Sequence, residues 1–196
     1  MLLTVTQETF GYWYRLKGVR DAPLRNEIEP GDIRDLLPYV FILETNRIKG
    51  YPFRVVGTRV DALFKRDLRG AQFVGLWQSV QRCEVEDLLQ VVADEKRPFL
   101  VGAWGAPVGG EEVELEVLLL PLEHFGKLGS RLFGSCVYRG TPSWLGILSL
   151  NQISMVSRTA FHVDSPPTSF DPNRAAAEGR APTTRKFPFL AYSKDR

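Results

Sequence analysis

Three glutamates at alternate positions have the spacing that most directly suggests chemistry in this sequence. Glu112, Glu114 and Glu116 lie in a segment where polar and apolar residues alternate, so a β-strand would place their carboxylates on one face. Paired carboxylates can act as a general acid and a general base. The same face continues with Leu118 and Leu120, and we therefore interpret the glutamates as the solvated end of a strand.

The other chemically capable residues are two cysteines and two histidines. Cys83 and Cys136 lie in different predicted elements, and we expect both thiols to be buried and reduced. Together with His124 and His162, they do not have the spacing of a metal site. The sequence also contains no nucleophile elbow and no phosphate-binding glycine loop. We therefore predict no enzyme activity, no catalytic residue, no metal and no cofactor.

Composition and charge indicate a single globular domain with extensions. The chain has 196 residues, of which 44% are hydrophobic and 11% aromatic, enough for one substantial core. It lacks an apolar run of membrane-spanning length and a signal peptide, so we expect a cytoplasmic protein that binds no membrane. Residues 164–196 hold six of the 25 basic and four of the 23 acidic residues, which leaves 19 of each in residues 1–163. Such a neutral body argues against a nucleic-acid partner.

The elements that must position these residues begin with a helix and a hairpin. Residues 6–17 predict a helix that ends at Gly18. Residues 39–43 predict a strand buried on both faces, and residues 51–56 predict an edge strand, joined to the first by the polar turn 45–50. This hairpin nucleates the expected core.

Short helices and three more strands follow the hairpin. Asp32 can cap a short helix over residues 33–37, and residues 59–64 predict a helical turn. The best amphipathic pattern covers residues 78–96 and ends before Pro98. The later extended segments are three strands and one segment of mixed periodicity: 99–104, 112–122, 131–138 and 145–156. The final residues predict a flexible tail.

The aromatic side chains of the first helix must be covered by something. They are Phe10, Tyr12, Trp13 and Tyr14. Because the strand 112–122 becomes apolar on its second face, the helix can pack on the chain's own sheet. A contact in a homodimer is the other interpretation, and the two can coexist.

A series of residues in a fixed order accompanies these elements. It consists of Tyr12, Trp13, Arg25, Ile28, Pro30, Leu36, Leu37, Pro38, residues 53–58, Phe64, Leu68, Gly70, Trp77, residues 119–122 and Gly134. This series resembles the PAS domain, and in particular an alphaproteobacterial-type subfamily of small stand-alone proteins, formerly described as a domain of unknown function. The resemblance covers residues 10–158 and departs at Lys65, where the subfamily usually has glycine.

The resemblance implies an α+β fold and a role in signalling. We expect a PAS-like five-stranded antiparallel sheet with helices over one face and the N-terminal helix on the other. The expected parts are an N-terminal helix at 1–22, a PAS domain at 23–158 and a flexible tail at 159–196. The long helix has no histidine that could bind haem, and Cys83 is followed by Glu-Val-Glu, unlike the cysteine motif of flavin photoreceptors.

A pocket is expected where the strands and helices of such a fold converge. Its expected lining is Phe41, Leu43, Phe53, Val55, Leu63, Phe64, Trp77, Leu88, Val92, Leu115, Val117, Phe133 and Ser135. This lining would hold an apolar or aromatic small molecule, with the Trp77 indole N–H and the Ser135 hydroxyl as polar contacts. A filled core is the alternative, although Gly57 and Gly134 favour space.

Two functions follow from these alternatives. The first is a sensory module that binds a small ligand or a signalling protein partner, without catalysis, and forms a homodimer through the N-terminal helix. The second is an adaptor with a filled core, whose exposed sheet face and FPFLAY segment (187–192) bind another protein. The same segment can instead dock back on the chain's own body.

Overall fold

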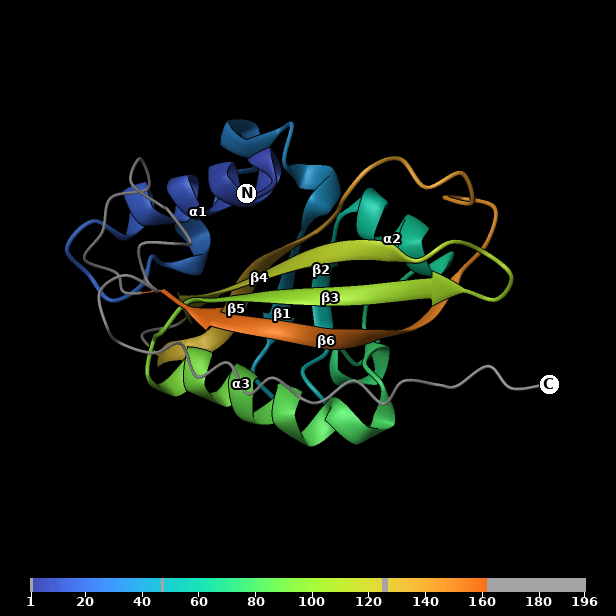
Figure 1. Cartoon of the computed structure of the whole chain (residues 1–196). Helices are drawn as coiled ribbons and strands as arrows, with labels where there is room; N and C mark the ends of the chain where they lie inside the picture. Colours follow the sequence, from blue (N-terminus) through green and yellow to red (C-terminus); the bar gives the residue numbers. More distant parts are fainter. Residues whose placement is uncertain (1, 47, 125–126, 162–196) are drawn as a thin grey trace, which may run out of the picture.

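A six-stranded antiparallel sheet forms the centre of the molecule (Figure 1). The computed structural model describes residues 2–46, 48–124 and 127–161. The strands are β1 (Val40–Glu44), β2 (Phe53–Val56), β3 (Phe99–Pro107), β4 (Val113–His124), β5 (Lys127–Tyr138) and β6 (Leu150–Ala160). Their order is β2-β1-β5-β4-β3-β6, so the early hairpin and the later strands join one sheet, as predicted.

The sixth strand is one more than the sequence predicts. β6 pairs with β3 along its whole length, and two register shifts interrupt that pairing. These irregularities break the two-residue alternation of buried and exposed side chains, which explains the mixed periodicity of residues 145–156. Phe161 follows β6 and is buried against Phe10, with ring centroids 5.2 Å apart. The folded body therefore extends past the predicted boundary at residue 158, whereas the rest of the predicted tail, including FPFLAY, lies outside the described residues.

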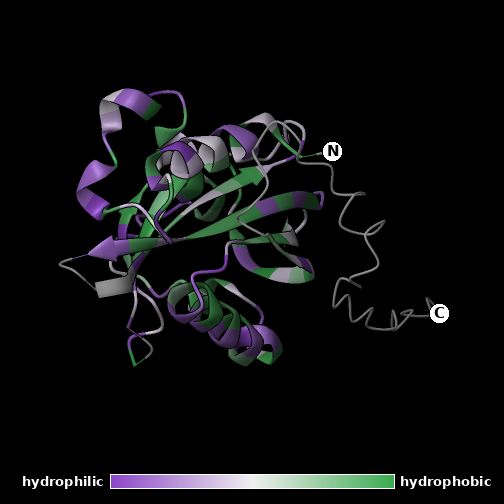
Figure 2. Cartoon of the chain, turned by 90° about the vertical axis from the view of Figure 1, so that its left-hand side faces the viewer, coloured by the Kyte–Doolittle hydropathy of each residue, from purple (hydrophilic) through white to green (hydrophobic). Residues whose placement is uncertain are grey.

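In the part of the chain that the structure describes, three α-helices flank the sheet. They are α1 (Thr4–Lys17), α2 (Thr58–Phe64) and α3 (Arg82–Asp94). The helix α1 ends at Gly18, whose N–H donates to the Tyr14 carbonyl and whose φ of 55° turns the chain out of the helix. The apolar side of α3 faces the sheet, and hydrophilic residues follow its outer side (Figure 2). Among the described residues, no helix is both long and apolar enough to cross a membrane.

Five short 3₁₀ helices complete the described elements. They are η1 (Arg25–Glu27), η2 (Pro30–Ile33), η3 (Leu37–Tyr39), η4 (Val74–Leu76) and η5 (Ser79–Gln81). The prediction of a helix at 33–37 capped by Asp32 is wrong, because Asp32 lies inside η2 and makes no capping hydrogen bond. Pro30 and Pro38 divide this segment into short turns, which suits 3₁₀ geometry.

Each face of the sheet carries its own hydrophobic cluster. The cluster under α2 and α3, which we call the α3-side core, includes Leu115, Val117 and Leu119 of β4. The cluster under α1, the α1-side core, includes Leu118 and Leu120 of the same strand. The strand β4 is therefore buried on both faces in its second half, and α1 supplies the predicted cover.

The two glycines that suggested space within the core serve close packing instead. A Cβ at Gly134 would lie 2.3 Å from the Leu118 carbonyl oxygen and 2.5 Å from the Phe41 ring. A Cβ at Gly57 would lie 2.3 Å from the Leu37 carbonyl oxygen. The interpretation that these glycines leave room for a ligand is therefore wrong, because backbone and ring atoms already occupy the space.

Candidate functional site

Ten of the thirteen predicted lining residues meet on the face under α2 and α3. They are Phe41, Leu43, Phe53, Leu63, Phe64, Trp77, Leu88, Val92, Leu115 and Val117. The strands β1, β2 and β4 supply the floor, and α2, α3 and the segment before α3 supply the cover. All ten are buried.

Val55 does not belong to this group. The pairing of β1 with β2 shifts register, so that Leu43 faces Phe53 but Ile42 faces Val55. Arg54 is the extra residue at this irregularity, and it breaks the alternation that would have placed Phe53 and Val55 on one face. As a result the Val55 side chain is 40% exposed.

Phe133 and Ser135 also lie elsewhere, on the face under α1. In the antiparallel pairs, Phe133 is opposite Ile42 and Leu120, which belong to the α1-side core. Ser135 is two residues further along β5 and shares that face. The β5 residues buried in the α3-side core are Leu132 and Cys136, and Tyr138 packs against it. The prediction missed them because it assigned the alternation of this strand to the wrong face.

Aromatic rings fill the centre of the α3-side core. Phe73 lies 5.6 Å from Phe41, 5.7 Å from Phe53 and 5.9 Å from Trp77 between ring centroids. The Phe41 and Phe53 rings meet edge to face at 5.7 Å. Sequence patterns did not identify Phe73, since it lies in an irregular segment between α2 and α3 where no periodicity marks the buried positions.

The indole N–H of Trp77 is the unusual polar group of this core. The Trp77 side chain is 1% exposed, and its Nε1 has no hydrogen-bond partner among the described residues. An unpaired buried donor costs about 1–3 kcal/mol. The backbone on either side of it is well fixed, because the Trp77 carbonyl accepts from Arg82 and the Gln78 N–H donates to Ile153 of β6. The segment that carries this donor is thus tied directly to β6.

A second tie to β6 follows a few residues later. The Gln81 side-chain amide donates to the Met155 carbonyl at 2.9 Å and accepts from the Met155 N–H at 2.8 Å. In this way Gln81 replaces a neighbouring strand at the outer edge of β6. Such covering protects an edge strand from pairing with another chain.

On the opposite face, polar bonds attach α1 to the sheet. The Glu116 carboxylate accepts from the Leu3 N–H at 3.0 Å and from the Thr6 hydroxyl at 2.7 Å. The Trp13 indole N–H donates to the Pro121 carbonyl at 2.8 Å. The prediction that Glu116 lies at a solvated strand end is wrong, because β4 passes under the N-terminus of α1 and this side chain is 7% exposed. Glu112 and Glu114, by contrast, are outside the core.

The aromatic residues of α1 are mainly covered by the chain itself. Phe10, Tyr12 and Trp13 are buried against the sheet, and Tyr14 is half-buried. The Tyr12 hydroxyl accepts from the Glu29 N–H at 2.9 Å and donates to the Glu27 carbonyl. Phe10, Tyr12 and Trp13 therefore expose little aromatic surface that a second copy of the chain could contact.

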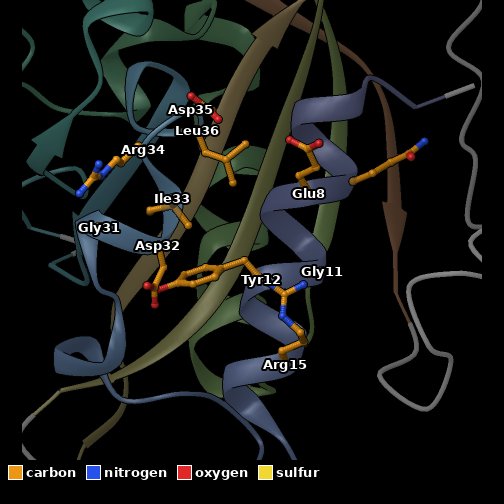
Figure 3. Close-up of a pocket in the computed structure, with 11 residues that line it drawn as sticks. Glu8, Gly11, Tyr12, Arg15, Gly31, Asp32, Ile33, Arg34, Asp35 and Leu36 are labelled. Atoms are coloured by element: carbon orange, nitrogen blue, oxygen red, sulfur yellow. The ribbon is translucent and has the colours of Figure 1, made fainter.

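An open groove of about 570 Å³ runs between α1 and the segment 31–36 (Figure 3). Its lining residues are Gln7, Glu8, Gly11, Tyr12, Arg15, Gly31, Asp32, Ile33, Arg34, Asp35 and Leu36. The Tyr12 ring points across the groove toward Asp32 (Figure 3). Burial raises the pKa of the Tyr12 hydroxyl, the Glu29 N–H opposes this effect, and the Asp32 carboxylate adds to it. Sequence patterns did not identify this groove. An irregular connection separates its two walls, α1 and the segment 31–36, and neither wall contains a binding motif.

The two cysteines differ in exposure. Cys136 is buried, and burial raises the pKa of its thiol to about 12, which makes it a poor nucleophile at neutral pH. Cys83 is exposed, contrary to the prediction, because it lies on the outer side of the first turn of α3. Both are free thiols. His124 closes β4, and His162 lies outside the described residues.

The antiparallel sheet with helices over both faces defines an α+β fold of the PAS class. A family model described as "PAS domain" matches residues 1–137, and the chain therefore belongs to the PAS domain family. PAS domains are generally non-catalytic sensory or signalling modules. No curated protein matches the chain.

Proposed function

We propose that this chain is a non-catalytic, cytoplasmic sensory module that binds a small apolar or aromatic molecule in the α3-side core. The observation that carries the proposal is the buried Trp77 indole N–H without a hydrogen-bond acceptor among the described residues. A ligand with a carbonyl oxygen or a ring nitrogen would satisfy this donor, while its apolar part would contact the surrounding rings. The ligand class is therefore an aromatic molecule with one acceptor.

Entry of such a molecule requires a side chain to move, since the core is filled. Phe73 is the best candidate, because it contacts Trp77 and comes from the irregular segment between α2 and α3. Its displacement would leave the strands of the sheet paired. The aromatic ring of the ligand would thus take the place of the Phe73 ring.

The bonds to β6 offer a route for the signal. Gln78 and Gln81 follow Trp77 and bond to Ile153 and Met155. A ligand that shifts Trp77 would pull on these bonds and alter the packing of β6, which leads to the C-terminal part of the chain. The two states would then differ in their ligand affinity, as a population shift requires.

Native mass spectrometry of protein purified from its own host tests the proposal. We expect a bound small molecule that is lost on denaturation. For a defined titration, refolded protein is mixed with quinoline, which has one ring nitrogen, and with naphthalene, which has none. Trp77→Phe should weaken quinoline binding about 2- to 12-fold, the equivalent of a hydrogen bond of about 0.5–1.5 kcal/mol, and leave naphthalene binding unchanged. Host-purified protein without a bound molecule and refolded protein that binds neither compound would contradict the proposal.

An adaptor with a filled core is the second candidate function. It is favoured by two large apolar side chains on the neighbouring strands β3 and β6, Trp104 at 41% exposure and Val156 at 55%. Either function is compatible with a homodimer or a signalling protein as the receiver. Trp104→Ser and Val156→Ser together should abolish co-purification of a protein partner if the adaptor function is correct, and should leave ligand binding unchanged if the sensory function is correct.

A further inference from the structure

The groove beside α1 has a feature that the proposed function does not use: acidic side chains without an ionic partner. Glu8, Asp32 and Asp35 line it, and none of them forms an ion pair within the part of the chain that the structure describes. Arg34 also belongs to the lining, but its guanidinium points away from α1 (Figure 3). Arg15 is the remaining basic residue, so three carboxylates outnumber one inward cation.

Little apolar surface is exposed between these acids. Ile33 and Leu36 are buried at the base of one wall, and the Tyr12 ring, which is also buried, forms part of the other. The walls also contain Gly11 and Gly31, and a Cβ at Gly31 would meet no atom within 4 Å. The groove therefore has room for an extended peptide whose basic side chains approach these acids.

One segment of this chain has that chemistry. Residues 185–196 read RKFPFLAYSKDR and combine four basic residues and one acid with the apolar run FPFLAY. The residue before a proline favours an extended conformation in any chain, and Pro188 would therefore lower the entropic cost of binding this segment in a groove. The segment lies outside the described residues.

The described chain ends close to the groove. Phe161 packs on Phe10 of α1, and the groove is formed by other residues of the same helix. The 23 residues from 162 to 184 would span about 24–29 Å as a flexible coil. Because a 14-residue helix is about 21 Å long, every part of the groove is within this reach.

We propose that residues 185–196 of the same chain dock in the groove between α1 and the segment 31–36. The basic residues would approach Glu8, Asp32 and Asp35, and the FPFLAY run would lie along the groove over Gly11 and Gly31. The tether gives the segment an effective concentration of the order of 1 mM, so a weak intrinsic affinity is enough for substantial occupancy. A partner that uses this groove must displace it.

Hydrogen exchange of the full-length protein tests the docking. The reporters are the amides of Asp32 and Leu36, which donate to Glu29 and Ile33. We expect the triple variant F187S/F189S/L190S to exchange at least threefold faster than wild type at these amides. The single variant F170S, which changes an aromatic residue elsewhere in the tail, should exchange like wild type.

A charge reversal in the groove provides a second test of the docking. The exposed pair E8K/D35K should produce the same acceleration, and adding it to the tail variant should produce no further change, because both remove one interaction. The control E111K/E112K changes the charge equally on an exposed turn away from the groove and should have no effect. A synthetic peptide of residues 185–196 should restore protection to the tail variant but not to the variant with the reversed charges.

Two results would overturn the proposal. Equal exchange in wild type and the tail variant would mean that the segment does not occupy the groove. Protection that increases with protein concentration would mean that a second copy supplies the occupant. Neither result bears on ligand binding at Trp77, which lies on the opposite face of the sheet.

Discussion

The two faces of the sheet use different means to hold their helices. Under α3, the core consists of aliphatic and aromatic side chains, polar contacts to β6 from Gln81 and Glu84 lie at its margin, and the Trp77 indole at its centre has no hydrogen-bond acceptor among the described residues. Under α1, apolar contact is supplemented by hydrogen bonds from Trp13 to Pro121 and from Leu3 and Thr6 to Glu116. Trp13 is thus satisfied on one face, whereas Trp77 at the centre of the other is not; Trp144, in the same core as Trp77, donates its indole N–H to the Glu111 carbonyl.

This difference separates a fixed face from an adjustable one. Apolar packing has no direction and can accept a different ring in place of Phe73, whereas directed hydrogen bonds fix the position of α1. The proposed ligand site and the proposed docking groove follow this division. The ligand site lies within the apolar α3-side core, which can rearrange. The docking groove lies beside α1, whose position is fixed by the hydrogen bonds to the sheet.

The largest effect is expected from removing the central residue of the fixed face. Trp13 is 0% exposed, so Trp13→Ala leaves a large cavity and orphans the Pro121 carbonyl. We expect a loss of about 3–5 kcal/mol in the free energy of unfolding, measured with urea. Trp104→Ala, on an exposed part of β3, should cost less than about 1 kcal/mol. Equal losses for the two variants would mean that α1 contributes little to the stability of the sheet.

The next effect concerns the carboxylate at the start of α1. Glu116→Ala removes the acceptor of the Leu3 N–H and the Thr6 hydroxyl, which leaves two donors at a buried helix N-terminus. We expect a loss of about 2–3 kcal/mol and faster hydrogen exchange in the first turn of α1. Glu112→Ala, an exposed residue of the same glutamate series, should change stability by less than about 0.5 kcal/mol. A similar loss of stability in both glutamate variants would mean that the hydrogen bonds to Glu116 do not hold α1 on the sheet.

How much of this could be read from the sequence depended on the regularity of each element. The hairpin, the strand β4 and the helix α3 have clear periodicity, and their predictions are confirmed. The faces of Val55 and Phe133 were assigned incorrectly, since a bulge in β2 and the choice of phase in β5 depend on pairing between strands. Local patterns do not contain that information.

The candidate sites show the same limit. Nine of the ten predicted lining residues lie on regular elements; in the irregular segment between α2 and α3, Trp77 was predicted and Phe73 was missed. Glu116 was misinterpreted because Glu112 and Glu114, earlier on the same face, lie outside the core, and because its partners, Leu3 and Thr6, are more than a hundred residues away. The groove beside α1 depends entirely on how two such segments meet.

The pH dependence of the unfolding free energy tests the α3-side core, in which Cys136 is buried. Burial raises the pKa of Cys136 to about 12 from 9.0, so above pH 9 the unfolded chain loses a proton that the folded chain keeps. The contribution to stability is therefore complete below pH 9 and decreases as pH rises toward 12, by about 1.4 kcal/mol per pH unit. Wild type should lose stability relative to Cys136→Ala between pH 8 and pH 10, as measured with urea. Parallel curves for the two proteins would mean that water reaches this thiol.

The smallest difference in stability is expected when the same substitution, tryptophan to phenylalanine, is made once on each face of the sheet. Trp13→Phe removes a donor that has an acceptor, and it leaves the buried Pro121 carbonyl unpaired. Trp77→Phe removes a donor that has no partner among the described residues, so only the change in volume remains. In refolded, ligand-free protein we expect Trp13→Phe to be more destabilising by about 1–2 kcal/mol, because the two substitutions delete the same atoms from sites of equal burial. If Trp77→Phe were equally costly, the Trp77 N–H would already be satisfied without a ligand, and the basis for a ligand acceptor at this position would be lost.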